Sequence, residues 1–231
     1  MAPSRGSSSP ERWRKTSSPR QTRIAVIGGT GDLGFGLALR LAKAYAVTIG
    51  SRDLDKATAA AAKAEALSQR VEAKTNEEAA RWCDIAILAV PELPSADLLA
   101  SLAPSLLEKL VISPIVPMRL ENGVFTVSLP EESAAERVSK ALPASRVAAA
   151  FHTVPAVRLA KLEETLAYDV LVTADSRAVY EEAARVVSSV GKLRPLYAGP
   201  LSVSRLVEGI TPALINVERL NKLKSPSIKL V

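Results

Sequence analysis

Short runs of apolar, often β-branched residues alternate along the chain with longer stretches in which apolar residues recur at helical spacing. This alternation predicts repeated β-α-β units and therefore an α/β fold, doubly wound, with a mainly parallel sheet. The predicted strands are Ile24–Ile27, Val47–Ile49, Ile85–Val90, Leu110–Ile112, Val147–Phe151, Val170–Thr173 and Leu193–Tyr197. The predicted helices are Leu33–Ala44, Ala57–Gln69, Ala96–Lys109, Ala134–Ala141 and Val179–Val190.

The same pattern divides the chain into three parts. Residues 1–22 are rich in Ser, Pro and Arg and lack apolar periodicity, which predicts a disordered basic leader. Residues 23–150 carry the strand and helix alternation, and 151–231 form a small C-terminal helical or α+β region packed against it. Its last helical stretch, 201–222, is interrupted at Thr211-Pro212. Because proline is tolerated only in the first turn of a helix, we expect a kink or a new helix capped by Thr211.

Charge and composition exclude several classes of function. The net charge is +6, but residues 1–22 hold five basic residues and one acid, so the remainder has 25 basic and 23 acidic residues. The folded part therefore lacks the basic surface of a nucleic-acid-binding protein, and no apolar run reaches the roughly 20 residues of a membrane helix. One histidine, His152, and one cysteine, Cys83, are too few for a metal site of these ligands. A single cysteine also excludes an internal disulfide and favours a cytoplasmic protein.

A glycine-rich turn carries the most specific chemistry. Gly29, Gly31 and Gly34 stand in G-x-G-x-x-G register directly after the first predicted strand and directly before the first helix. In this context the glycines permit a tight turn, a close approach to a pyrophosphate, and packing of the helix on the strand. The free N–H groups of the helix start favour the phosphates. The turn predicts a Rossmann-type dinucleotide-binding domain.

The end of the second predicted strand indicates which dinucleotide binds. Domains that prefer NAD carry an acidic residue there, whereas this chain has Ser51 and Arg52, with Lys56 four residues further on. A serine hydroxyl and a guanidinium suit a ribose 2′-phosphate. We therefore expect NADP(H). The alternative is that Arg52 is a solvated residue at the start of the helix and that the domain discriminates poorly between NAD and NADP.

Prolines follow two further buried strands, at Pro91 and at Ser113-Pro114. Ligands bind at the carboxyl ends of strands in open α/β sheets, so these segments are candidates for lining the nicotinamide. His152 follows another strand in the segment Phe151-His-Thr-Val-Pro-Ala156. Such a histidine serves as a structural hydrogen-bonding group, in substrate binding, or in proton transfer.

Several segments together resemble one family, the NADPH-dependent reductases of the deazaflavin coenzyme F420 (8-hydroxy-5-deazaflavin:NADP oxidoreductases). The resemblance spans residue 23 to the C-terminus. The segments that carry it are Gly28–Gly34, Gly50–Arg52 with Lys56, Ser113–Pro117, His152–Ala156 and Leu193–Glu208.

The resemblance implies NADP(H) as cofactor, coenzyme F420 as co-substrate, and a homodimer whose other partners are small molecules. The hydride would pass directly from one cofactor to the other, so the protein need only stack, orient and exclude water. Implied site residues comprise the NADP-binding positions Thr30, Gly31, Asp32, Leu33, Ser51, Arg52 and Lys56, the nicotinamide neighbours Val90, Pro91, Met118 and Ala156, and the deazaflavin neighbours Ser113, Pro114 and His152.

Two other functions fit the same residues. The fold could serve an NADPH-dependent reductase of a small imine or keto acid, which would need a proton donor near the substrate. It could also serve a non-catalytic NADP(H) sensor, which would bind the nucleotide tightly without turnover.

Overall fold

The computed structural model describes residues 20–90, 93–128 and 131–231. The predicted leader, 1–22, lies almost wholly outside the described residues. Eight strands form one sheet in the order β10-β9-β8-β5-β4-β1-β2-β3. These strands are β1 (Arg23–Ile27), β2 (Ala46–Ser51), β3 (Val71–Thr75), β4 (Ile85–Leu88), β5 (Leu110–Ser113), β8 (Arg146–Ala149), β9 (Asp169–Ala174) and β10 (Arg194–Gly199). The order from β3 to β8 is that of a Rossmann fold, so the predicted fold class is confirmed.

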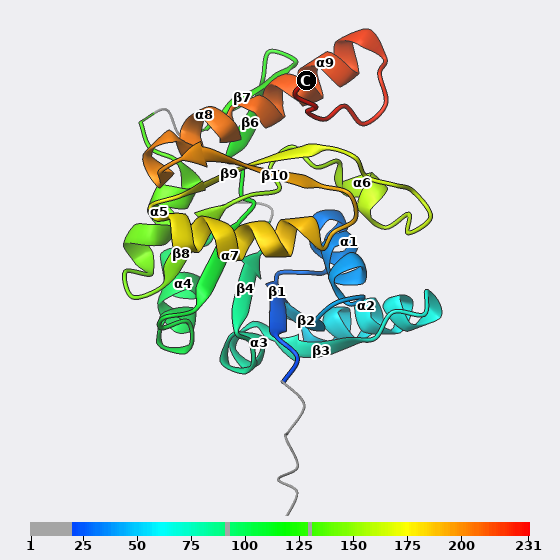
Figure 1. Cartoon of the computed structure of the whole chain (residues 1–231), viewed down its shortest axis with the longest axis vertical. Coiled ribbons are helices and arrows are strands. Elements are labelled where there is room, and N and C mark those ends of the chain that lie inside the picture. Colours follow the sequence, from blue (N-terminus) through cyan, green and yellow to red (C-terminus); the bar gives the residue numbers. More distant parts are fainter. Residues whose placement is uncertain (1–19, 91–92, 129–130) are drawn as a thin grey trace, which may run out of the picture.

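Helices cover both faces of this sheet (Figure 1). Alternate side chains of β1 divide between two apolar cores: Ile24 and Val26 pack with one set of helices, and Ala25 and Ile27 with the other. This two-sided burial is why the strands read as nearly continuous apolar runs. The first core is covered by α1 (Asp32–Leu41), α2 (Leu54–Ala66), α6 (Ala156–Leu159) and α7 (Arg177–Ser188), and the second by α3 (Asn76–Trp82), α4 (Ala96–Leu102) and α5 (Ala134–Ala141).

The C-terminal elements extend and cover the sheet. Strand β9 pairs antiparallel with β8 and parallel with β10, so the sheet is parallel up to β8 and reverses beyond it. A hairpin of β6 (Met118–Glu121) and β7 (Val124–Val127) packs on α9 (Ile210–Asn221), which follows α8 (Ser204–Glu208). Figure 1 shows α8, α9 and the hairpin together on one side of the sheet.

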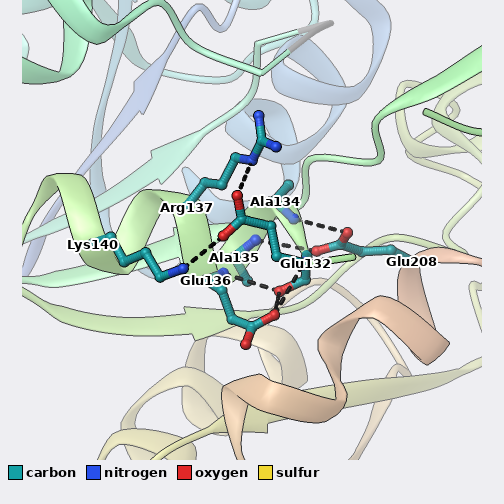
Figure 2. Close-up of polar contacts among 8 residues, drawn as sticks. Glu132, Ala134, Ala135, Glu136, Arg137, Lys140 and Glu208 are labelled. Carbon is teal, nitrogen blue, oxygen red and sulfur yellow. Dashed lines mark hydrogen bonds and ion pairs between the residues drawn. The ribbon is translucent and has the colours of Figure 1, made fainter. Parts of the chain in front are cut away.

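A buried carboxylate fastens this layer to the core. Glu208 of α8 is fully buried, and its two oxygens accept hydrogen bonds from the main-chain N–H groups of Ala134 and Ala135 at 3.0 and 3.2 Å (Figure 2). These N–H groups belong to the first turn of α5, where no helical acceptor exists. Burial raises the pKa of Glu208, and the two N–H bonds oppose that rise. Glu132, which precedes α5, pairs with Arg137 and Lys140 of that helix (Figure 2).

Two helix predictions need correction. The predicted helix Ala96–Lys109 ends as an α-helix at Leu102 and continues only as a 3-10 turn over Ala103–Ser105, because Pro104 cannot extend the α-helical ladder. Helix α9 begins at Ile210 with Gly209 at its N-cap, so Pro212 lies in a first turn as expected, but Thr211 is not the cap. The Thr211 hydroxyl instead donates to the main-chain oxygen of His152 at 2.9 Å.

The sequence prediction omitted β3, α3, both strands of the β6–β7 hairpin and the short helix α6. Strand β3 lies at the sheet edge and buries fully only Val71, so its apolar pattern is weak. Helix α3 begins with a capping box formed by Thr75 and Glu78, a T-x-x-E signature that is visible in the sequence. The β6–β7 hairpin turns at Asn122-Gly123, both with positive φ, as a two-residue turn of this composition requires.

Candidate functional site

One large cavity lies at the carboxyl ends of the parallel strands. Its volume is about 1280 Å³, larger than the roughly 300–1,000 Å³ that hold one ordinary small ligand. Its walls come from the segments after β1, β2, β4, β5 and β8 on one side, and from α9 and the C-terminal tail on the other. The order of strands reverses between β1 and β4, which is where ligands bind in open α/β sheets.

The glycine turn forms one end of the cavity. Gly28 has a φ of +70°, and its N–H donates to the Asn76 side-chain oxygen at 3.2 Å. A Cβ atom on Gly34 would lie 2.6 Å from the Cα of Gly29, so these two glycines let α1 pack against the turn. A Cβ on Gly31 would meet no protein atom within 4 Å, although Gly31 lines the cavity. The space beside Gly31 is therefore open for a ligand.

The start of α1 provides a site for an anion. Gly31 is the N-cap and contributes no side-chain cap, so the first N–H groups of the helix lack the usual intramolecular acceptor. Thr30, Asp32 and Leu33 line the cavity around this helix end. Exposed N–H groups and the helix dipole together favour a phosphate.

Polar side chains after β2 extend this end of the cavity. Ser51, Arg52 and Lys56 all line it. Asp53 also lies here, but its carboxylate caps α2 by accepting from the N–H groups of Asp55 and Lys56, and it stands 3.8 Å from the Lys56 ammonium. Arg52 is exposed and forms no ion pair with another described residue. The guanidinium is therefore available to an anionic ligand.

The opposite part of the cavity is mainly apolar. Val90 follows β4, Pro114 follows β5, and Ala156 begins α6 after β8. Met118 at the start of the hairpin, Leu214 of α9 and Pro226 of the tail complete this part. Such a lining suits the face of a planar ring system.

His152 contributes a polar side chain to this apolar part. It is 7% exposed, and neither ring nitrogen has a hydrogen-bond partner among the described residues. Burial lowers the pKa of His152 to about 4, so the ring is neutral at pH 7 and presents one N–H donor and one acceptor. Phe151, directly before it, has a φ of +71°, a conformation rare for an aromatic residue. Strain of this kind concentrates at functional sites.

The buried histidine predicts a loss of stability in mild acid. Its pKa is lowered from 6.5 to about 4, so between these pH values the unfolded chain binds more protons than the folded one. The contribution of neutral His152 to the free energy of unfolding is complete above pH 6.5. It declines by on the order of 3 kcal/mol as the pH falls towards 4. Denaturant titrations of the wild type and His152→Phe at several pH values measure it. If the two proteins differ in free energy of unfolding by the same amount at every pH, the lowered pKa of His152 is contradicted.

Most of the site residues predicted from the sequence line this single cavity. Three differ. Gly29 packs beneath α1 and is not part of the wall. Ser113 is wholly buried at the end of β5, and its neighbour Pro114 lies in the wall instead. Pro91 lies outside the described residues. The predicted residues in the wall are Thr30, Gly31, Asp32, Leu33, Gly34, Ser51, Arg52, Lys56, Val90, Met118, Pro114, His152 and Ala156.

Other residues of the wall were not predicted. Asn76 is 2% exposed and holds the glycine turn through the bond to Gly28. Glu218 of α9 accepts the main-chain N–H of Ser225 at 3.0 Å and thereby bends the tail into the wall. The capping box before Asn76 could have located α3, but no local signal connects it with the turn 48 residues earlier.

Residues 23–117 match the family described as NADP oxidoreductase, coenzyme F420-dependent. The chain is 39% identical over 218 residues to the F420-dependent NADP reductase of Methanothermobacter thermautotrophicus, an alignment that covers 90% of this chain and 94% of that protein. It is 38% identical over 221 residues to the reductase of the same name from Methanocaldococcus jannaschii, covering 90% and 97%. This chain belongs to the coenzyme F420-dependent NADP oxidoreductase family.

A solved structure shares the fold of this family member. A chain from Arthrobacter sp. FB24 superposes with a TM-score of 0.76 at 21% identity, covering 90% of this chain and 98% of that one. In the part of the chain that the structure describes, no helix is long and apolar enough to cross a membrane. The same described residues contain no cluster of His, Cys, Asp or Glu side chains suited to a metal ion.

Proposed function

We propose that this oxidoreductase transfers a hydride directly between NADP(H) and coenzyme F420 inside this cavity. The observation that carries the proposal is the cavity itself, which joins a phosphate-binding helix start to an apolar chamber around a neutral, unpartnered His152. Its volume of about 1280 Å³ favours two ligands side by side over one. Membership of the family supports the identity of both cofactors.

We assign NADP(H) to the end formed by 23–150. The pyrophosphate would lie beside Gly31, where the absent side chain leaves open space at the start of α1. The 2′-phosphate would bind the Ser51 hydroxyl and the Arg52 guanidinium, with Lys56 adding charge. The nicotinamide would extend towards Val90, Met118 and Ala156.

We assign the deazaflavin to the chamber completed by 151–231. His152 would donate or accept one hydrogen bond to the ring edge, because its neutral imidazole has both functions free. Pro114 on one side and Leu214 with Pro226 on the other would confine the ring. When bound, the two cofactors supply the hydride donor and acceptor carbons, so the residues around them have to orient the rings and exclude water.

The alternatives have less support. A reductase of a small imine or keto acid would want a proton donor at the reacting carbon, and His152 with its lowered pKa is a weak acid–base group at neutral pH. The curated relatives at 37–39% identity are F420-dependent NADP reductases, which favours the F420 reaction over this reductase and over a sensor.

Cofactor preference gives a direct test of the phosphate end. We expect Arg52→Ala to weaken NADPH binding about 10- to 100-fold, because a charge-assisted bond to the 2′-phosphate contributes roughly 1.5–3 kcal/mol. NADH, which lacks that phosphate, should bind equally to both proteins. Lys63→Ala, an exposed cation of α2 outside the cavity, is the matched control. Equal loss of NADH and NADPH affinity would show that Arg52 does not contact the phosphate.

The proposal includes a cytoplasmic homodimer. Large apolar side chains are exposed on the C-terminal elements, with Leu206 at 74% and Leu220 at 71%, and a second copy would cover them. We expect light scattering to give twice the chain mass of 24.5 kDa for the wild type. The double variant Leu206→Glu/Leu220→Glu should give the mass of a single chain. A wild type of 24.5 kDa would refute the dimer.

The reaction itself is tested by mixing the protein with NADPH and oxidised coenzyme F420. Loss of the visible deazaflavin absorbance with NADPH, and much slower loss with NADH, is the expected result. Tight NADPH binding without any bleaching would overturn the proposed reaction and favour the sensor.

A further inference from the structure

Arg40 is an unusual buried cation at the end of α1. It is 5% exposed, and it forms no salt bridge with any described residue. Its Nε donates to the main-chain oxygen of Leu159 at 2.7 Å. Its Nη2 lies 3.3, 2.6 and 3.1 Å from the main-chain oxygens of Arg158, Lys161 and Glu164. One guanidinium therefore holds the carbonyls of a seven-residue segment that is about 120 residues away in sequence.

Gly36 makes room for the contact between α1 and α6. A Cβ on Gly36 would lie 2.3 Å from the Cβ of Leu159, so α1 and α6 approach each other as closely as their backbones allow. Gly191 also lies beside the guanidinium, and its φ of +104° is a backbone conformation that L side chains rarely adopt. The close approach of α1 and α6 therefore depends on Gly36.

The two segments that Arg40 joins belong to different ends of the cavity. Helix α1 begins at Asp32, in the phosphate end, and reaches Arg40 in its last turn. Helix α6 begins at Ala156, in the apolar chamber, and its last residue is Leu159. The bonds of Arg40 thus fix the distance between the helix that holds the phosphates and the wall Thr153–Val157.

We propose that Arg40 is a positioning residue for hydride transfer, which rests on the proposed function above. It touches neither cofactor site, because it does not line the cavity. It acts by keeping the wall Thr153–Val157, which includes the proposed nicotinamide neighbour Ala156, in register with the pyrophosphate site. Binding of the phosphates depends on the start of α1 and on the segment after β2, whereas the reaction also depends on the wall Thr153–Val157. A misplacement of about 1 Å can lower a rate about 100-fold.

The test separates positioning from a merely structural role. The variants are Arg40→Met, which keeps the apolar stem and removes every donor, and Arg40→Lys, whose ammonium can satisfy only part of the four carbonyls. Lys109→Met is the control, because Lys109 also donates to two main-chain oxygens, those of Ala80 and Arg81, but lies outside the cavity. For each variant we would measure thermal unfolding, NADPH affinity, affinity for the nicotinamide-free fragment 2′-phospho-ADP-ribose, and single-turnover reduction of coenzyme F420 at saturating NADPH.

We expect Arg40→Met to slow the single turnover about 10- to 100-fold while the affinity for the fragment changes less than about threefold. Arg40→Lys should fall between Arg40→Met and the wild type. Lys109→Met should lose stability without loss of rate per folded molecule.

A wild-type rate in Arg40→Lys and Arg40→Met, with only the unfolding temperature lowered, would overturn the inference. If Arg40→Met does not fold, Arg40→Lys decides: a slowed turnover with intact fragment binding supports positioning, and an unchanged turnover refutes it. Absence of turnover by the wild type would overturn the proposed function and this inference with it, so the two failures are distinguishable.

Discussion

Gly31→Val should abolish most of the NADPH affinity and leave the fold intact. The position has extended backbone, with φ −83° and ψ 170°, which valine adopts readily, and a Cβ there meets no protein atom within 4 Å. The added side chain would instead occupy the space assigned to the pyrophosphate. Loss of two charge-assisted bonds to the helix N–H groups corresponds to roughly 3 kcal/mol or more, and therefore to at least about a 100-fold weaker binding.

Calorimetric titration with NADPH, together with thermal unfolding, measures this effect. Gly34→Ala is the informative contrast, because its Cβ would lie 2.6 Å from the Cα of Gly29. We expect that variant to lose about 1–3 kcal/mol of stability through overpacking. Unchanged NADPH affinity in Gly31→Val would place the pyrophosphate elsewhere in the cavity.

Asp169→Ala should release the C-terminal tail, 222–231, from the sheet. The Asp169 side chain is fully buried and accepts two bonds from the Arg194 guanidinium, at 2.8 and 2.6 Å, and one from the N–H of Leu230 at 2.6 Å. Lys229 lies 3.5 Å away. The same tail places Ser225 and Pro226 in the wall of the chamber, and the Ser227 hydroxyl donates to the main-chain oxygen of Thr153.

We expect a loss of about 2–3 kcal/mol in the free energy of unfolding, below the roughly 3–5 kcal/mol of a wholly buried pair because Arg194 is half exposed. The Michaelis constant for coenzyme F420 should rise about tenfold, an increase that corresponds to roughly 1.4 kcal/mol, and NADPH affinity should not change. Lys140→Gln, which breaks the solvent-exposed pair with Glu132, is the control and should cost at most about 1 kcal/mol. An unchanged Michaelis constant for coenzyme F420 would show that the tail is not part of the substrate wall.

The same carboxylate contributes to acid sensitivity. The Arg194 guanidinium holds the pKa of Asp169 well below its usual range. Because the folded pKa is lowered, the stabilisation is complete above the ordinary pKa of 3.8 and is lost as the pH falls below it. This range lies below that of His152, so the two contributions separate along one pH titration.

Sequence patterns predicted the site where it depends on local signals. The turn from Gly29 to Gly34 lies between a strand and a helix, so its role could be inferred from ten residues of sequence. Arg52 stood at a predictable distance from that turn. Both inferences depend on contacts within one β-α-β unit, which the order of residues determines directly.

The remaining features depend on contacts between distant segments. Arg40 has the polarity expected of an exposed helix residue, yet it is buried by a loop about 120 residues later in the chain. Glu208 appears as a surface acid in the sequence but caps α5. The reversal of β9 likewise has no local signal, because an apolar strand has the same pattern in either direction. Tertiary partners decided these three features, and sequence periodicity does not specify them.

Direct hydride transfer between the two cofactors can be followed by isotope labelling. NADPH carrying deuterium at nicotinamide C4, prepared separately as each of its two stereoisomers, is mixed with the protein and oxidised coenzyme F420 in ordinary water, and the reduced product is examined by mass spectrometry and NMR. We predict that one stereoisomer delivers its deuterium to C5 of the deazaflavin without dilution by solvent hydrogen. Reduced coenzyme without deuterium at C5, from both stereoisomers, would show that the transferred hydrogen comes from solvent and would exclude direct transfer.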